Sequence, residues 1–467
     1  MRDLTLPKIA SGRHFFEGFP WISATFCYSM SWCFLLVRPN TLYWDDWQGV
    51  FKRPSNYINV SRREMGLPPW ASWIESFFLP NQIYIIRLLT FVLFFCCGIF
   101  FFEIIKSTAF FNIKQSRLLV IIFLVAPVNH ARIGVVMFLY TTSYFLFFGA
   151  WLIAIRSRNR LAISSSLVLF FLSLATHSLL FMIFLPVLHL LFLKLAEQNQ
   201  LNIRATLQSL CVSLLVPTYL ILRKAFWPPI DRWVGYNSPA LISSLRGAVL
   251  FVPSIALGLL LILAIKKNHA TKPIIATVTI GFLSVAVALF PYVLSDNIDR
   301  NFYKYEIGWQ SRHLMLTPLG VSLIITGLSQ FLPKSNHLLA NLFIAFSISV
   351  NLFAGSQYYL QSIQQEEIVW LLESNRISES ISEFVDETPQ FKGRGAVYSE
   401  YEFFGMLNKA GYEYPRRVGY KYVCKYAPGG FRLTLKSDVT FLEGLRTRQL
   451  GTYFEIIPCS KVLATEN

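Results

Sequence analysis

Charged residues are scarce in this chain. They make up 15% of its 467 residues, while hydrophobic residues make up 54% and aromatic residues 16%. Soluble globular domains carry about 25% charged residues, most of them on the surface. A soluble globular protein is therefore excluded, and the composition is that of a membrane protein.

Cysteine is also uncommon, with seven residues in the whole chain. Five of them, expected to be buried structural thiols, lie in apolar segments: Cys27, Cys33, Cys96, Cys97 and Cys211. Cys424 and Cys459 lie in the polar C-terminal region and could form one disulfide in an oxidising compartment. Neither a CxxC pair nor a His/Cys spacing typical of a structural zinc site is present.

Long apolar runs recur from Trp21 to about Phe353. A hydrocarbon core of roughly 30 Å needs about 20 apolar residues per spanning helix, and we count about eleven such segments. They are 21–38, 84–105, 116–129, 134–155, 161–176, 178–193, 205–222, 242–265, 273–294, 312–331 and 337–354. Lipid cannot satisfy backbone hydrogen bonds, and the runs lack the alternation of a barrel, so an α-helical polytopic membrane domain over 1–354 is predicted.

The ends of these segments predict the orientation. Basic residues favour an inner N-terminus, and an odd number of spans then places residues 355–467 on the outer side. That region becomes polar and alternating, which predicts a small α+β extracytoplasmic domain. The first apolar run follows about twenty mixed residues and has no small-residue cleavage site, so we expect it to remain as an anchor.

The first outer loop, residues 39–83, is too long for a simple connector. Its prolines at 68, 69 and 80, interspersed with tryptophan and phenylalanine, predict a short amphipathic helix at the membrane interface, roofing a cavity.

The loop begins with the sequence YWDDW, Tyr43 to Trp47. Burial raises the pKa of a carboxyl group and a nearby cation lowers it, so Asp45 and Asp46 stand where acid–base chemistry can be tuned. One carboxylate could accept a proton while the other holds the loop or a divalent metal, Mg²⁺ or Mn²⁺, with Asp46 and Glu64 as candidate ligands. Alternatively, the pair only caps a helix or solvates a turn.

A second polar cluster, SDNIDRNFYKYEIGWQSRH, precedes the segment 312–331. The planar fork of an arginine can bind a phosphate at this position, or the side chain can extend to the lipid headgroups. The candidate phosphate ligands, with two cations from the first loop, are Arg312, His313, Arg300, Lys304, Lys52 and Arg53. Further candidates for substrate contacts are Trp44, Trp47, His130, Arg132, His177 and Trp309.

This arrangement resembles the GT-C superfamily of integral-membrane glycosyltransferases. The resemblance is carried by Asp45 and Asp46 in YWDDW and by Arg312 with His313 in WQSRH. It implies transfer of a sugar from a polyprenyl-phosphate donor to a cell-envelope glycan or lipid acceptor, outside a bacterial inner membrane. It also implies that one of the two aspartates is the general base.

Chemistry explains why such a reaction needs these groups. A carboxylate that takes the acceptor proton accelerates the attack by about 10²–10⁴. A phosphate can leave as an anion if cations stabilise its charge, so a single displacement would invert the anomeric centre. No Rossmann fingerprint is present to bind a soluble nucleotide sugar.

Two alternatives stay open. A polysaccharide polymerase or ligase acting on lipid-linked glycans would also span the membrane many times, but it has no special need for an acidic pair after the first span. A flippase without catalysis predicts charged residues in the middle of spans, whereas Arg87 and Glu103 lie near segment ends. Basic residues spread over both membrane sides argue against a nucleic-acid partner.

Overall fold

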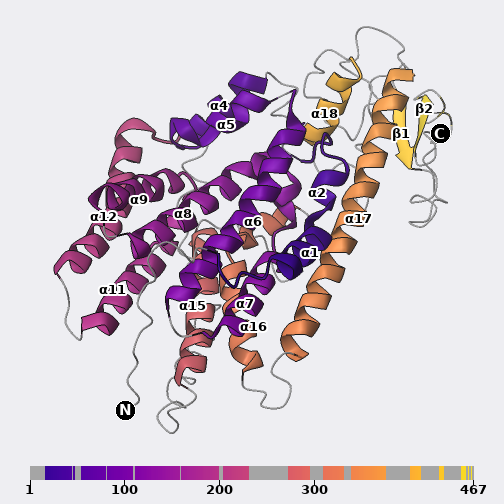
Figure 1. The fold of residues 1–467 in the computed structure, drawn as a ribbon. Coiled ribbons are helices and arrows are strands. Elements are labelled where there is room, and N and C mark those ends of the chain that lie inside the picture. Colours follow the sequence, from indigo (N-terminus) through magenta and orange to yellow (C-terminus); the bar gives the residue numbers. More distant parts are fainter. Residues whose placement is uncertain are drawn as a thin grey trace.

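The computed structural model is almost entirely helical in the residues it describes (Figure 1). These residues are 16–44, 46–47, 54–79, 81–108, 111–157, 159–198, 203–230, 272–294, 309–330, 338–374, 400–411, 431–435, 454–458, 461 and 464. The predicted segment 242–265, most of the polar cluster before Trp309, and Cys424 and Cys459 lie outside them.

Five helical segments of this part of the chain are long and apolar enough to cross a membrane: Ile83–Ser107, Val135–Arg156, Thr206–Phe226, Ile274–Pro291 and Leu338–Ser374. Three shorter apolar helices, Arg160–Ser173, Leu179–Leu191 and Pro318–Ser329, accompany them. The prediction of a helical membrane protein is thus confirmed, while the number of eleven spans stays a prediction.

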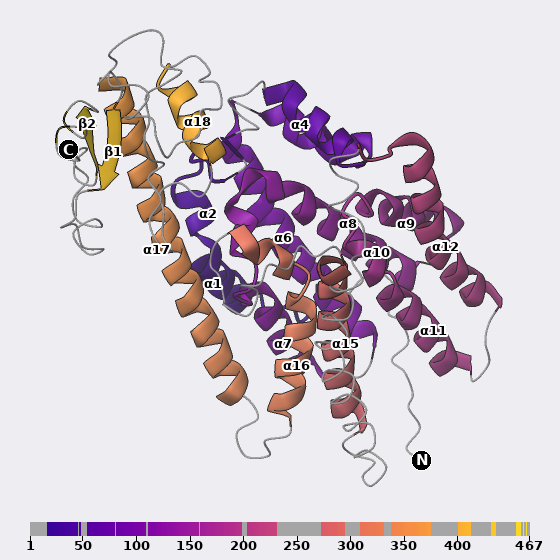
Figure 2. The same ribbon diagram turned by 180° about the vertical axis from the view of Figure 1, so that it is seen from behind.

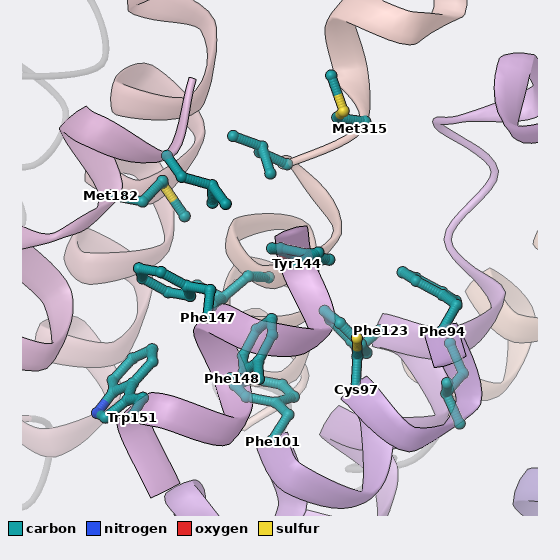
Figure 3. Packing of buried hydrophobic residues seen from close by; sticks show 14 of the residues in the cluster. Phe94, Cys97, Phe101, Phe123, Tyr144, Phe147, Phe148, Trp151, Met182 and Met315 are labelled. Carbon is teal, nitrogen blue, oxygen red and sulfur yellow. The ribbon is translucent and has the colours of Figure 1, made fainter. Parts of the chain in front are cut away.

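Helices α6 (Ile83–Ser107), α7 (Ile113–Val125) and α8 (Phe138–Arg156) form the centre of the bundle. Their buried faces carry an aromatic cluster (Figure 3). The ring of Phe123 lies 5.4 Å from Phe94, 4.9 Å from Phe101 and 5.7 Å from Phe148. Aromatic pairs at such distances add packing energy beyond the burial of their surface.

Other helices surround this centre. On one side lie α9 (Arg160–Ser173), α10 (Leu179–Met182), α11 (Phe184–Gln198) and α12 (Ile203–Phe226) (Figures 1 and 2). Helices α15 (Lys272–Leu294) and α16 (Pro318–Ser329) approach closely, because a Cβ atom at Gly320 would lie 2.6 Å from the carbonyl oxygen of Gly281. Small residues permit such close helix contacts in membranes.

The first apolar segment is not one helix. It consists of α1 (Trp21–Trp32) and α2 (Phe34–Val37), which meet at Cys33. The predicted span 178–193 is likewise divided between α10 and α11 at Ile183. The span predicted from residue 312 starts as the 3₁₀ helix η6 (Trp309–Leu314), and α16 begins only at Pro318, whose fixed φ suits a first helical position.

Helix α17 (Leu338–Ser374) continues far beyond the predicted end at residue 354. Its C-terminal half is rich in glutamine, glutamate and leucine, which favour helix as much as the apolar half does. The region beyond also contains α18 (Glu400–Lys409) and strands β1 (Phe431–Leu435) and β2 (Phe454–Pro458), which pair antiparallel with Phe431 opposite Pro458. A separate domain over 355–467 stays a prediction.

The first outer loop contains helix α4 (Pro54–Glu64), the 3₁₀ helix η1 (Pro69–Ser72) and helix α5 (Trp73–Phe78). Helix α5 exposes Trp73 and Phe77 but buries Glu75. Trp73, Ile74 and Phe77 therefore face away from the protein, as expected of a helix at a lipid interface, while Phe78 packs against the bundle. Both α4 and α18 lie at the end of the bundle where α17 ends (Figures 1 and 2).

Candidate functional site

Asp46 lies in a tight turn that follows α2. Its side chain is buried, with 1% of the residue exposed. Oδ2 accepts a hydrogen bond from the backbone N–H of Tyr43 at 3.2 Å, and Oδ1 accepts one from Val136 at 3.0 Å. Val136 belongs to the 3₁₀ helix η3 (Val135–Met137), which leads into α8. The carboxylate thus ties the first loop to the start of a central helix.

Burial raises the pKa of Asp46 to about 6. The charge of Arg87 and the backbone N–H groups of Val135, Val136 and Tyr43 oppose this rise without cancelling it. A carboxyl group with this pKa is ionised at neutral pH and can still take up a proton readily.

Arg87 is the cation that the structure brings close to this turn. It lies on α6, is 1% exposed, donates a hydrogen bond to the carbonyl of Thr41 and stands 5.1 Å above the ring of Tyr43. Its Nε and Nη1 have no hydrogen-bond partner among the described residues. The sequence offers one signal for Arg87, because a charge inside an apolar run often marks a functional site even near the end of a span.

A second buried acid, Glu75, is linked to Asp46 through the backbone of Val136. Arg62 donates to the carbonyl of Val136 at 2.7 Å, and its Nη2 also lies 3.2 Å from Oε1 of Glu75. Burial raises the pKa of Glu75 to about 7, against the opposing charge of Arg62. Helix α5 therefore turns its acidic residue into the protein.

The arginine expected to bind phosphate lies near the same backbone segment. Arg312 belongs to η6, which packs against the 3₁₀ helix η2 (His130–Ile133). The hydroxyl of Ser311 accepts a hydrogen bond from the N–H of Ala131 at 2.7 Å. Asp46 and η6 therefore contact the two ends of the segment 131–136.

His130 and Arg132 are turned into the bundle. Nε2 of His130 lies 2.8 Å from Oδ1 of Asn351. The guanidinium of Arg132 lies between two rings, 3.4 Å from the centre of Phe94 and 4.3 Å from that of Trp32. The structure thus places both side chains in the core, and not beside Asp46.

His177 belongs to a different part of the bundle. It lies in the link between α9 and α10, with its ring 6.0 Å from that of Tyr219 on α12. The structure therefore groups His177 with α12 and not with the turn at Asp46.

Trp44 and Trp47 are packed inside the protein, each 3% exposed. The indole N–H of Trp47 donates to the carbonyl of Leu42 at 3.1 Å, and the ring of Trp44 lies 5.7 Å from that of Tyr358. A sugar could stack on either ring only after this packing opens.

The remaining predicted residues are less fully described. Asp45, Lys52, Arg53, Arg300 and Lys304 lie outside the described residues, as do the side chains of Trp309 and His313. Glu64 is described at the end of α4. Within the described chain there is no group of three or more His, Cys, Asp and Glu side chains suited to a metal, so a metal at Asp46 and Glu64 stays a prediction.

A groove of about 190 Å³ adjoins the turn, between the α1–α2 break and α17. Its lining is largely apolar and aromatic: Cys33, Phe34, Val37, Arg38, Tyr43, Leu352, Gly355, Ser356, Tyr358 and Tyr359. Val37 and Leu352 are exposed, which places part of the lining on the outer surface of the bundle. Tyr43 joins groove and turn, because its hydroxyl donates to the carbonyl of Tyr358 at 3.0 Å while its N–H binds Asp46.

No family, curated protein or solved structure matches this chain.

Proposed function

We propose that this protein is a membrane glycosyltransferase of GT-C type. It moves a sugar from a polyprenyl-phosphate donor to a cell-envelope glycan or lipid acceptor on the outer side of a bacterial inner membrane. The observation that carries the proposal is Asp46, a buried carboxyl group with a pKa raised to about 6, whose partner Tyr43 also lines an apolar groove at the bundle surface.

In the proposed reaction, Asp46 accepts the proton of an acceptor hydroxyl as its oxygen attacks the anomeric carbon. The bond between that carbon and the phosphate oxygen breaks, and its electron pair leaves with the lipid phosphate. One displacement inverts the anomeric centre. Asp46 is then protonated and releases its proton to solvent before the next cycle.

Cations near the turn support departure of the phosphate. Arg87 has two nitrogens without hydrogen-bond partners among the described residues, and Arg312 lies on η6 at the other end of the segment 131–136. A positive group placed where negative charge develops lowers the barrier. The groove between α2 and α17 offers an apolar path for the prenyl chain, so the donor need not leave the lipid.

Access to Asp46 requires movement, because the residue is 1% exposed. Binding of donor and acceptor would have to displace the loop around Asp46. Many enzymes open and close loops over the active site in this way. The side of the membrane is also part of the proposal. Basic residues, among them Lys106, Lys114, Arg117 and Arg156, cluster around the C-terminal end of α6, opposite Arg87, as expected for the inner side.

The test is transfer of radiolabelled sugar from a polyprenyl-phosphate donor by the full chain in proteoliposomes. We expect Asp46→Asn to lower the rate by about 10²–10⁴ while the protein still inserts. Glu373→Gln, an exposed residue at the end of α17, is the matched control and should retain the wild-type rate. Wild-type turnover in Asp46→Asn would refute the assignment of Asp46 as the general base. Asp45→Asn is measured in parallel, and loss of transfer in that variant alone would move the role to Asp45.

A further inference from the structure

Helix α18 contributes a buried carboxylate to the turn at Asp46. Glu402 is fully buried, and its Oε1 accepts a hydrogen bond from the backbone N–H of Trp44. The preceding N–H, that of Tyr43, binds Asp46. Two carboxylates, from opposite ends of the chain, therefore bind consecutive amides of one turn.

The contact extends along one face of α18. A Cβ atom at Gly405 would lie 2.7 Å from Cβ of Trp47, and Nζ of Lys409 lies 6.0 Å from the ring centre of Trp47. Positions three and four residues apart share a helix face, so Glu402, Gly405 and Lys409 face the turn together. Met406 packs in the same hydrophobic cluster as Trp47.

The turn needs an external support. Trp44 has φ of +50°, in the left-handed region that bulky residues seldom adopt. Such a backbone persists only where the surrounding structure holds it. The N–H that Glu402 binds belongs to this same residue, two positions before Asp46.

We propose that Glu402 is a positioning residue. It holds Trp44 in its left-handed conformation and thereby keeps the carboxylate of Asp46 hydrogen-bonded to the backbone N–H of Val136. The catalytic meaning of this role rests on the proposed glycosyl transfer, but the positioning does not. The C-terminal region is then part of the site and not an appendage to it.

The first measurement follows the turn itself. The full chain in proteoliposomes is treated with a water-soluble carbodiimide and glycine ethyl ester, and modification of Asp46 is quantified by mass spectrometry. We expect Glu402→Ala to raise the rate of modification about tenfold, since a hydrogen bond to a charged acceptor is lost. Glu402→Gln, which keeps an acceptor oxygen, should remain closer to wild type.

Met406→Ala separates positioning from simple docking of α18. Met406 is fully buried, so this variant weakens the packing of the helix, while Glu402 still accepts the hydrogen bond from the N–H of Trp44. We expect less modification of Asp46 in Met406→Ala than in Glu402→Ala. Equal modification in these two variants, or protection of Asp46 in Glu402→Ala equal to wild type, would overturn the proposal.

Transfer assays on the same samples separate this inference from the proposed function. If Glu402 positions the base, Glu402→Ala should lower kcat about tenfold or more, with KM little changed. If Asp46 is modified faster in Glu402→Ala but the wild-type protein transfers no sugar, positioning is supported and glycosyl transfer is rejected. If the wild-type protein transfers sugar, and Glu402→Ala changes neither the modification of Asp46 nor kcat, positioning is rejected while the proposed function stands.

Discussion

The guanidinium of Arg62 lies 3.2 Å from the carboxylate of Glu75, and both side chains, from helices of the first outer loop, are buried. The same nitrogen of Arg62 donates to the carbonyl of Val136, whose N–H binds Asp46. The backbone of one residue, Val136, thus connects an ion pair on α4 and α5 to the proposed base.

Removal of one partner of this pair should be costly. Arg62→Met leaves Glu75 buried without its cation, and breaking a buried pair in this way costs about 3–5 kcal/mol. The double variant Arg62→Met with Glu75→Gln should lose less, because no uncompensated charge remains. Denaturant unfolding in detergent measures the free energy of unfolding, and a loss below about 1 kcal/mol in Arg62→Met would contradict a buried pair.

Stability should fall as the pH rises from about 4 to about 7. Burial raises the pKa of Asp46 to about 6 and that of Glu75 to about 7, so in this range the folded protein keeps protons that the unfolded chain releases. Stability therefore decreases with pH, although the cations Arg87 and Arg62 limit the effect and Glu402 adds a nearby acid. The check is Tm against pH for wild type and for Asp46→Asn with Glu75→Gln. Parallel curves would contradict the two raised pKa values.

The rate of transfer should rise with pH through a midpoint near 6, because the ionised form of Asp46 is the base. Arg87 lowers the pKa of Asp46, so Arg87→Met should move this midpoint to higher pH. Lys114→Met, an exposed position on α7, is the control for loss of a cation and should leave the midpoint unchanged. An unchanged midpoint in Arg87→Met would show that the charge of Arg87 does not act on the pKa of the base.

A bulky residue in the groove should impair use of the lipid donor. Ser356→Phe fills the space between α2 and α17, and we expect the KM for a long-chain polyprenyl donor to rise about tenfold. A short-chain donor that does not occupy the groove should be used as by wild type. Ser349→Phe, on an exposed position of the same helix, is the matched control. Equal KM values for both variants would place the prenyl chain elsewhere.

Some features of the site could be predicted from local sequence. The sequence YWDDW follows an apolar segment, and prolines interspersed with tryptophan and phenylalanine later in the same loop predict a short interfacial helix in the region where α5 lies. Span ends were less predictable. Residues 355–374 are polar but helical, so the change in composition at 354 did not mark the end of α17.

The partners of Asp46 were not predictable in this way. Arg87, Glu75 and Glu402 lie on α6, α5 and α18, and each is buried because of what packs against it. Arg87 resembles an ordinary charge near a span end, and Glu402 lies in a region that sequence reasoning assigned to a separate domain. Conversely, Arg132 was expected to face a substrate but lies between the rings of Phe94 and Trp32.

Sequence alone determined that this is a helical membrane protein with an acidic turn after its first apolar segment. Both features depend on hydrophobicity and residue type over a few neighbouring positions, which the chain displays directly. Tertiary structure alone decided which charges become buried and which of them meet. The energy of a buried charge depends on the groups that replace its water, and those groups come from helices far apart in the sequence.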